Sequence, residues 1–192
     1  MEENLTNEER LILISDMISQ AKKNFASGGS FHFLLWGWVI SLANFGHYFL
    51  EKFDLFDAPF IVWLITFPAS VVSIWYGFAK SKNAPVRSHL DTVYSSIWIS
   101  VFAMVIICLV FMAKLGFNHN PIILLFAGLG TFISGILMKY RPIKIGGIIL
   151  WVGACMGLFS SVTDQQLIAG ISVILGQLIP GYMLKKVESK DV

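Results

Sequence analysis

Six long runs without Asp, Glu, Lys or Arg dominate the sequence. They cover residues 31–50, 58–79, 92–113, 115–138, 145–163 and 165–184. Each run holds about 19 to 24 residues, and at about 1.5 Å rise per residue an α-helix of that length crosses a hydrocarbon layer of about 30 Å. Only 14% of the chain is charged, against about 25% for a soluble domain. The sequence therefore predicts an all-α, polytopic membrane bundle of six transmembrane helices.

The chain is predicted to divide into three parts. Residues 1–30 are expected to form a cytoplasmic amphipathic helix that begins at a capping box of Thr6 and Glu9. Its apolar positions recur at helical spacing: Leu11, Ile14, Ile18, Ala21 and Phe25. Because a free helix would leave these side chains in water, we expect it to lie on the inner membrane surface or on the bundle, with a solvated leader helix as the alternative. Residues 31–184 form the predicted transmembrane domain, and 185–192 a cytoplasmic tail.

Basic residues are divided unequally between the two sides of the predicted bundle. Twelve lie in segments on the side of the N-terminus: Arg10, Lys22, Lys23, Lys80, Lys82, Arg87, Lys139, Arg141, Lys144, Lys185, Lys186 and Lys190. Only Lys52 and Lys114 lie in loops on the opposite side. Cytoplasmic loops carry an excess of Lys and Arg. We therefore expect both termini in the cytoplasm.

Small and polar side chains interrupt the apolar runs at helical spacing, as Gly37, Ser41 and Asn44 do in the first run. The candidate site residues are Asn44, His47, Thr66, Ser70, Ser73 and Gln177. Because lipid solvates apolar faces, membrane helices associate through small residues and modest polar contacts, so these side chains are expected to pack helices together; a polar pathway is the alternative. His47 lies one turn before Glu51, which favours an interfacial boundary residue over a ligand or a proton relay.

If these stripes are packing surfaces, a bulky side chain at a small residue is the costliest change. Gly157→Leu is expected to cost about 1–3 kcal/mol through overpacking, and Asn44→Leu about 0.6 kcal/mol. His47→Gln should cost least, because interfacial water can replace the bonds of the ring. Pro68, in the middle of the second run, predicts a kink, and Pro180 followed by Gly181 is expected to shape the inner end of the sixth.

The runs lack the chemistry that most membrane enzymes and proton-coupled carriers use. Such carriers keep ionisable groups at mid-membrane for function, and none of the six runs holds Asp, Glu, Lys or Arg. Met104, Cys108 and Met112 recur every fourth residue and would suit Cu(I), but Met and Cys are also ordinary packing residues. We therefore expect no enzymatic activity, no cofactor, no metal site and no nucleic-acid partner.

Three short motifs carry a resemblance to a family. FLLWGW at 33–38, His47–Tyr48 at the end of the first run and LIPGY at 178–182 resemble a group of small bacterial six-helix inner-membrane proteins with no assigned activity. The resemblance implies a multi-pass protein of the bacterial inner membrane. We expect a non-enzymatic accessory or regulatory component that meets membrane lipids and either a membrane protein partner or a second copy. The alternative is a transporter or channel for a small solute or a lipid.

The topology can be tested with an impermeant thiol reagent on intact cells. In a cysteine-free background, single cysteines at Asp54, Asn118 and Asp164 are expected to react from outside, because the loops that hold them are poor in basic residues. A cysteine at Ser88 should react only after the membrane is permeabilised. Labelling at Ser88 while the other three stay silent would contradict the predicted orientation.

Overall fold

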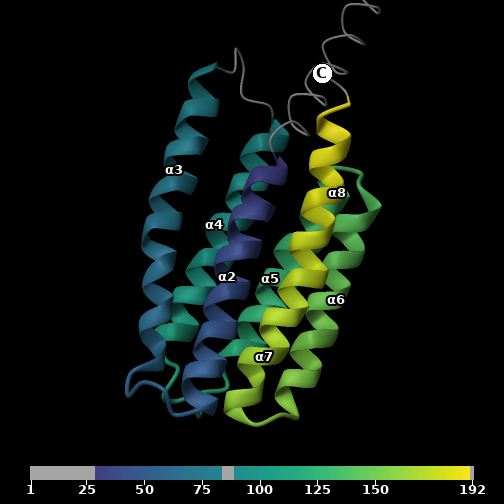
Figure 1. The fold of residues 1–192 in the computed structure, drawn as a ribbon. Helices are drawn as coiled ribbons and strands as arrows, with labels where there is room; N and C mark the ends of the chain where they lie inside the picture. The colour runs from purple at the N-terminus through teal and green to yellow at the C-terminus, as the bar shows by residue number, and fades with distance from the viewer. Residues whose placement is uncertain (1–28, 84–88, 191–192) are drawn as a thin grey trace, which may run out of the picture.

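The computed structural model describes residues 29–83 and 89–190, and these form a bundle of long helices that lie side by side (Figure 1). The elements are α2 (Gly29–Lys52), η1 (Pro59–Ile65), α3 (Thr66–Asn83), α4 (His89–Val110), α5 (His119–Leu137), α6 (Arg141–Leu158), α7 (Val162–Val173), η2 (Ile174–Leu178) and α8 (Ile179–Glu188). They provide six stretches long and apolar enough to cross a membrane. The predicted all-α six-span bundle is therefore confirmed. Of the predicted N-terminal helix, 1–30, residues 1–28 lie outside the described residues, and the last two belong to α2.

The helices alternate in direction, so the loops gather at two ends of the bundle. One end holds the start of α2, the turn between α5 and α6, and the end of α8 (Figure 1). We call it the terminal end. The opposite end holds the α2–η1, α4–α5 and α6–α7 connections, and we call it the distal end.

Some helices begin or end at other residues than the uncharged runs do, because prolines and turns set the ends of a helix more directly than charged residues do. α6 begins at Arg141 instead of near residue 145, because Pro142 occupies its first turn, where a missing N–H costs nothing. α4 ends at Val110, and residues 111–118 form turns in which Gly116 has a positive φ of 57°. The last helix continues past 184 to Glu188, so the first half of the predicted tail, residues 185–188, is helical.

The second span changes helix type near Pro68. Residues Pro59–Ile65 form a 3-10 helix, and the α-helix starts at Thr66. Pro68 is the third residue of α3, where an N–H would have no partner within the helix. The proline therefore breaks no hydrogen bond of α3, and the helix type changes close to it, at Thr66.

The last span contains a π-helical segment, Ile174–Leu178, between α7 and α8. Pro180 follows it closely and cannot donate an N–H to the carbonyl of Gly176 four residues earlier. The N–H of Ile179 reaches back to the carbonyl of Ile174, which widens the helix by one residue. Pro180 is therefore associated with the π-helical turn in the middle of the last span, in addition to the inner end, where the sequence predicted its effect.

α6 lies at the centre of the packing, and glycines let its neighbours approach its backbone. A Cβ at Gly147 would lie 2.7 Å from the backbone nitrogen of Phe132 on α5. A Cβ at Gly146 would lie 1.9 Å from the carbonyl oxygen of Gly176. Two buried apolar clusters surround these contacts: Leu124, Leu150, Ala154, Ala169 and Val173 join α5, α6 and α7, whereas Phe33, Ile143 and Leu184 join α2, α6 and α8. α2, α5, α6 and the last span thus form the core.

α3 and α4 pack on this core with one face each. Phe67 and Trp75 of α3 are 70% exposed, as is Val110 of α4. α3 is held by Ser73, which bonds α2, and α4 by Trp98, whose Nε1 donates to the core at Ser134 Oγ over 3.1 Å. The two helices therefore present most of their surface to the surroundings of the bundle.

Gly146→Ala should destabilise the fold by about 1–3 kcal/mol, because its methyl group would overlap a backbone carbonyl that no side-chain rotation can move. The matched control is Gly77→Ala, since a Cβ at Gly77 of α3 would meet nothing within 4 Å. Unfolding in mixed micelles measures both. Among the described glycines, an added Cβ comes closest to a neighbouring backbone at Gly146, whereas a Cβ at Gly157 would lie 3.0 Å from a proline ring carbon. Equal stability of the two alanine variants would contradict the close approach.

Candidate functional site

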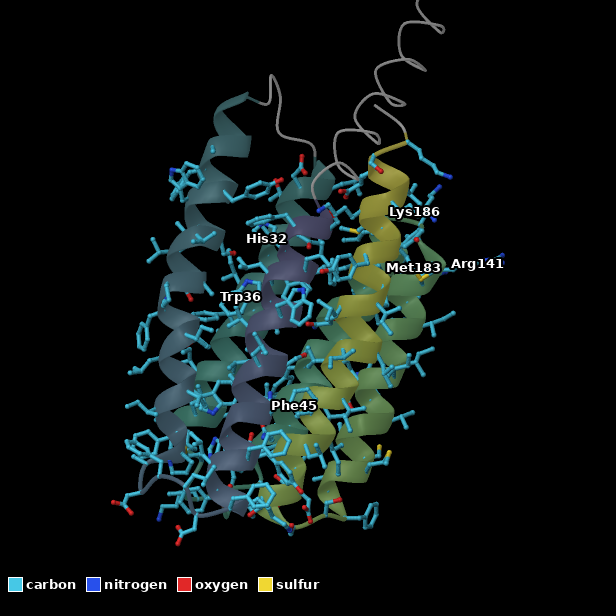
Figure 2. The ribbon with its side chains drawn as sticks, in the orientation of Figure 1. His32, Trp36, Phe45, Arg141, Met183 and Lys186 are labelled. Atoms are coloured by element: carbon cyan, nitrogen blue, oxygen red, sulfur yellow. The ribbon has the colours of Figure 1, made fainter. Side chains whose placement is uncertain are left out.

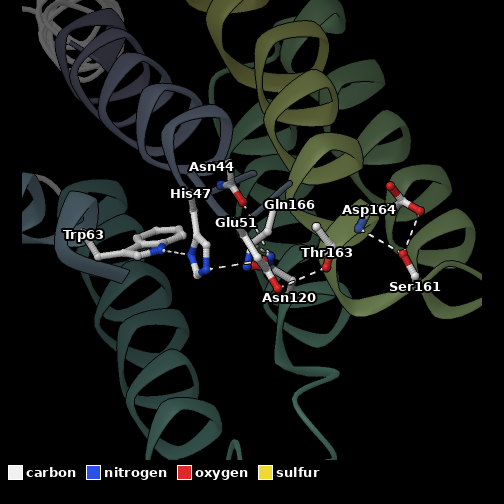
Figure 3. A network of polar contacts seen from close by, with 9 residues as sticks. All are labelled: Asn44, His47, Glu51, Trp63, Asn120, Ser161, Thr163, Asp164 and Gln166. Carbon is white, nitrogen blue, oxygen red and sulfur yellow. Dashed lines mark hydrogen bonds and ion pairs between the residues drawn. The ribbon is translucent and has the colours of Figure 1, made fainter. Parts of the chain in front are cut away.

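Polar side chains gather inside the distal end of the bundle (Figure 3). They come from the end of α2, the start of α5 and the start of α7. We define the distal polar cluster as Asn44, His47, Asn118, His119, Asn120, Gln165 and Gln166. Four of its members are less than 6% exposed, which is unusual for amides unless they are hydrogen-bonded.

Asn120 links three helices. Its Nδ2 donates to Gln166 Oε1 over 2.7 Å and lies 3.5 Å from Asn44 Oδ1 (Figure 3). Asn44 in turn donates from Nδ2 to the carbonyl oxygen of Ile40 over 2.9 Å. Each of the three amides thereby has a partner, and α2, α5 and α7 are joined by side chains at this depth.

His47 extends the contacts toward the second span. Trp63 Nε1 donates to His47 Nδ1 over 2.9 Å, so the neutral ring carries its proton on Nε2. That nitrogen lies 3.7 Å from Glu51 Oε2, and Glu51 Oε1 accepts from Thr163 Oγ1 over 3.0 Å. His47 is therefore held between η1 and a carboxylate that also binds α7, and its position at the membrane boundary stays a prediction.

Two helix starts place the remaining members of the cluster. Ser161 caps α7: its Oγ accepts from the backbone N–H of Asp164 over 3.2 Å and donates to the Asp164 carboxylate over 2.6 Å. This cap puts Gln165 and Gln166 in the first turn of the helix, facing inward. Asn118 occupies the N-cap position of α5 without a side-chain cap hydrogen bond, and Asn120, two residues on, is buried. The starts of two helices thus carry these amides into the interior.

Two buried atoms of the cluster have no hydrogen-bond partner among the described residues. They are Oε1 of Gln165 and Nδ1 of His119. Gln165 is only 1% exposed, and its Nε2 donates to Asn118 Oδ1 over 2.7 Å. An unpaired buried polar atom costs about 1–3 kcal/mol. The pair therefore marks the place where the cluster could accept water or a small hydrogen-bonding solute.

The six candidate site residues do not form one site. Thr66 Oγ1 and Ser70 Oγ donate to backbone carbonyls of their own span over 2.6 and 2.7 Å. Ser73 Oγ lies 3.1 Å from His32 Nδ1 near the terminal end, so it holds α3 on α2. Gln177 Nε2 donates to Thr131 Oγ1 over 3.1 Å inside the core. Only Asn44 and His47 belong to the distal polar cluster, and the stripes therefore serve separate helix contacts.

The amides that surround Asn44 were not among the candidate residues predicted from the sequence. Asn120, Gln165 and Gln166 lie at the starts of two uncharged runs, and all three are buried. The signal was present in the sequence, because Ser161 followed three residues later by Asp164 is a capping pattern. Across the described ranges 29–83 and 89–190, no three His, Cys, Asp or Glu side chains are grouped so as to hold a metal.

The bond between Asn120 and Gln166 can be measured by a double-mutant cycle. We expect Asn120→Leu and Gln166→Leu to be coupled by about 0.6 to 1.7 kcal/mol, the range for hydrogen bonds between membrane helices. Unfolding in mixed micelles gives the four free energies. Ser96→Ala is the control, because Ser96 is exposed and bonds only its own helix, at the carbonyl of Thr92. A coupling energy of zero would show that the amides do not bind each other.

No protein family, no curated protein and no solved structure matches this chain. The resemblance to small bacterial six-helix membrane proteins therefore stays a prediction, and function is inferred from the residues of the chain itself.

Proposed function

We propose that the chain is a non-enzymatic accessory or regulatory component of the bacterial inner membrane, with both termini in the cytoplasm. The observation that carries the proposal is the outer face of α4, which is exposed along its length and bears a stripe of small side chains. This face is suited to a transmembrane helix of another membrane protein or of a second copy.

The outer face of α4 is rich in small residues. Val101 and Cys108 are buried against the core, whereas Ser96, Ser100 and Ala103 are exposed. The two hydroxyl groups donate to carbonyls of their own helix over 2.8 Å, so they need no partner in lipid. Small residues at this spacing let a second helix come close, which is how membrane helices associate. The face therefore supports the accessory role.

The interior supports the same role. Gln177 and Thr131, the polar pair inside the core, are bonded to each other. The backbones of α6 and the last span approach at Gly146 and Gly176 until a single methyl group would not fit between them. A polar path along the core would have to break these contacts, and this favours a rigid bundle over an alternating carrier.

A transporter or channel for a small solute or a lipid is the second candidate. It is favoured by the unpartnered Oε1 of Gln165 and Nδ1 of His119 in the distal polar cluster, where a solute could be bound. It predicts that Gln165→Leu removes the cellular phenotype of the protein while its membrane partners stay bound.

The orientation rests on the basic residues of the terminal end. Lys139, Arg141 and Lys144 lie at the turn between α5 and α6, and Lys185 and Lys186 in the last turn of α8. Cytoplasmic segments carry such an excess. For the thiol-labelling test, Phe159 is the better reporter of the distal end than the partly buried Asn118, because it is 94% exposed.

Site-specific photo-cross-linking in cells tests the accessory role. A photoreactive residue at Ile99, beside the small-residue stripe and 68% exposed, is expected to form one discrete protein adduct. The matched control is Ile148 on α6, which is also exposed, at 46%, but lies on a face without that stripe. Ser100→Leu should reduce the adduct at Ile99 severalfold, because a large side chain prevents close helix approach. Mass spectrometry of the adduct separates a partner protein from a second copy.

Protein adducts of equal yield at Ile99 and Ile148, or none at either position, would contradict the accessory role. A discrete adduct that Ser100→Leu leaves unchanged would place the partner elsewhere and remove the reason for choosing this face.

A further inference from the structure

A groove at the terminal end combines positive charge with apolar walls. It has a volume of about 300 Å³ and is lined by Tyr140, Met183, Lys186, Val187 and Lys190. Four of these residues are spaced i, i+3, i+4 and i+7, so they share one face of α8 and the turn that follows it. Tyr140 contributes the opposite wall from the turn between α5 and α6. Figure 2 shows Met183 and Lys186 on this side of the bundle.

The two lysines of the groove have no acidic partner among the residues that the structure describes. The acidic residue of α8, Glu188, faces α2 instead, where its carboxylate accepts from the backbone N–H of Ser30 over 3.1 Å and from Ser30 Oγ over 2.5 Å. Arg141, the exposed first residue of α6, adds a further cation on the same side (Figure 2). The groove therefore offers uncompensated cations to an anion.

Tyr140 is held in a fixed position beside these lysines. Its ring packs against the buried cluster of Phe33, Ile143 and Leu184. Burial also raises the pKa of Tyr140 above its ordinary value, so the phenol stays protonated and can donate a hydrogen bond. The anion site thus has one rigid neutral donor in addition to two flexible ammonium groups.

The apolar walls identify the source of the anion. Met183 lies seven residues before Lys190, which is about 10 Å deeper along the helix, and Val187 lies between them. A free phosphate ion would gain nothing from these side chains, whereas a lipid acyl chain would cover them. Lys186 and Lys190 lie at the end of the last apolar span, Val162–Glu188, and lysines that flank a membrane span attract the phosphates of anionic lipids.

We propose that this groove binds one anionic phospholipid, with its phosphate on Lys186, Lys190 and the hydroxyl group of Tyr140, and its acyl chain along Met183 and Val187. The site is independent of the proposed accessory role and lies at the end of the bundle opposite to the distal polar cluster. A lipid bound in this groove would contact both the α5–α6 turn and the end of the last span.

Native mass spectrometry of the full-length chain, titrated with phosphatidylglycerol in a neutral detergent, tests the site. One lipid should bind more tightly than the rest. Lys186→Gln and Lys190→Gln should each weaken its binding about fivefold, the factor for one lysine near an anionic surface, and Tyr140→Phe should weaken it about two- to fivefold. The matched control is Lys185→Gln, an exposed lysine on the same turn of α8 that does not line the groove, and it should leave the affinity unchanged.

Two further arms separate the sources of the anion. Phosphatidylcholine, whose headgroup has no net charge, should bind at least several-fold more weakly, and millimolar inorganic phosphate should not displace the bound lipid. The proposal is overturned if Lys185→Gln weakens binding as much as Lys186→Gln, because the effect would then be general surface charge. It is also overturned if phosphatidylcholine binds equally well or if inorganic phosphate displaces the lipid.

Discussion

The backbones of α6 and the last span meet at Gly146 and Gly176, and the rest of the bundle is arranged around this contact. In lipid, apolar side chains lose little by facing outward, so helices stay together where their backbones come close and where polar groups find partners. The next residue, Gly147, points about 100° away around the helix and meets α5. Two consecutive glycines thus let α6 pack closely against two neighbouring helices, and α6 lies at the centre of the packing.

The irregular last span follows from the same contact. Pro180 leaves the carbonyl of Gly176 without an α-helical donor four residues on, and the π-helical turn directs this carbonyl toward Gly146. The wider turn also carries Gln177, whose amide reaches Thr131 on α5. A buried amide in lipid would otherwise be costly. The proline, the glycines and the glutamine therefore form one packing unit, although each alone could be mistaken for a gate or a site.

The surfaces that carry the functional proposals lie away from this unit. The distal polar cluster lies inside the bundle at the distal end, and the basic groove of α8 lies on its surface at the terminal end. The small-residue stripe of α4 faces outward. The distal polar cluster is buried, since Asn44 and Gln165 are each only 1% exposed. The α4 stripe and the α8 groove lie on the surface, as the exposure of Ser96 and Lys186 shows. A rigid interior with open outer faces agrees with a protein that acts through what binds around it.

The uncharged runs by themselves determined that the chain is an all-α six-span membrane bundle. Each run is long enough to cross the apolar layer, and in lipid the backbone N–H and C=O groups must be hydrogen-bonded to each other, as they are in a helix. Local signals such as Pro142 and the Ser161 cap determined where helices begin, and the cap could have revealed the inward amides. The partner of each polar side chain was decided by the tertiary structure alone. Thr66 and Ser73 look alike in sequence, yet one bonds its own helix and the other holds two helices together. Helical spacing places a side chain on a face, whereas only the packing of separate helices determines what that face meets.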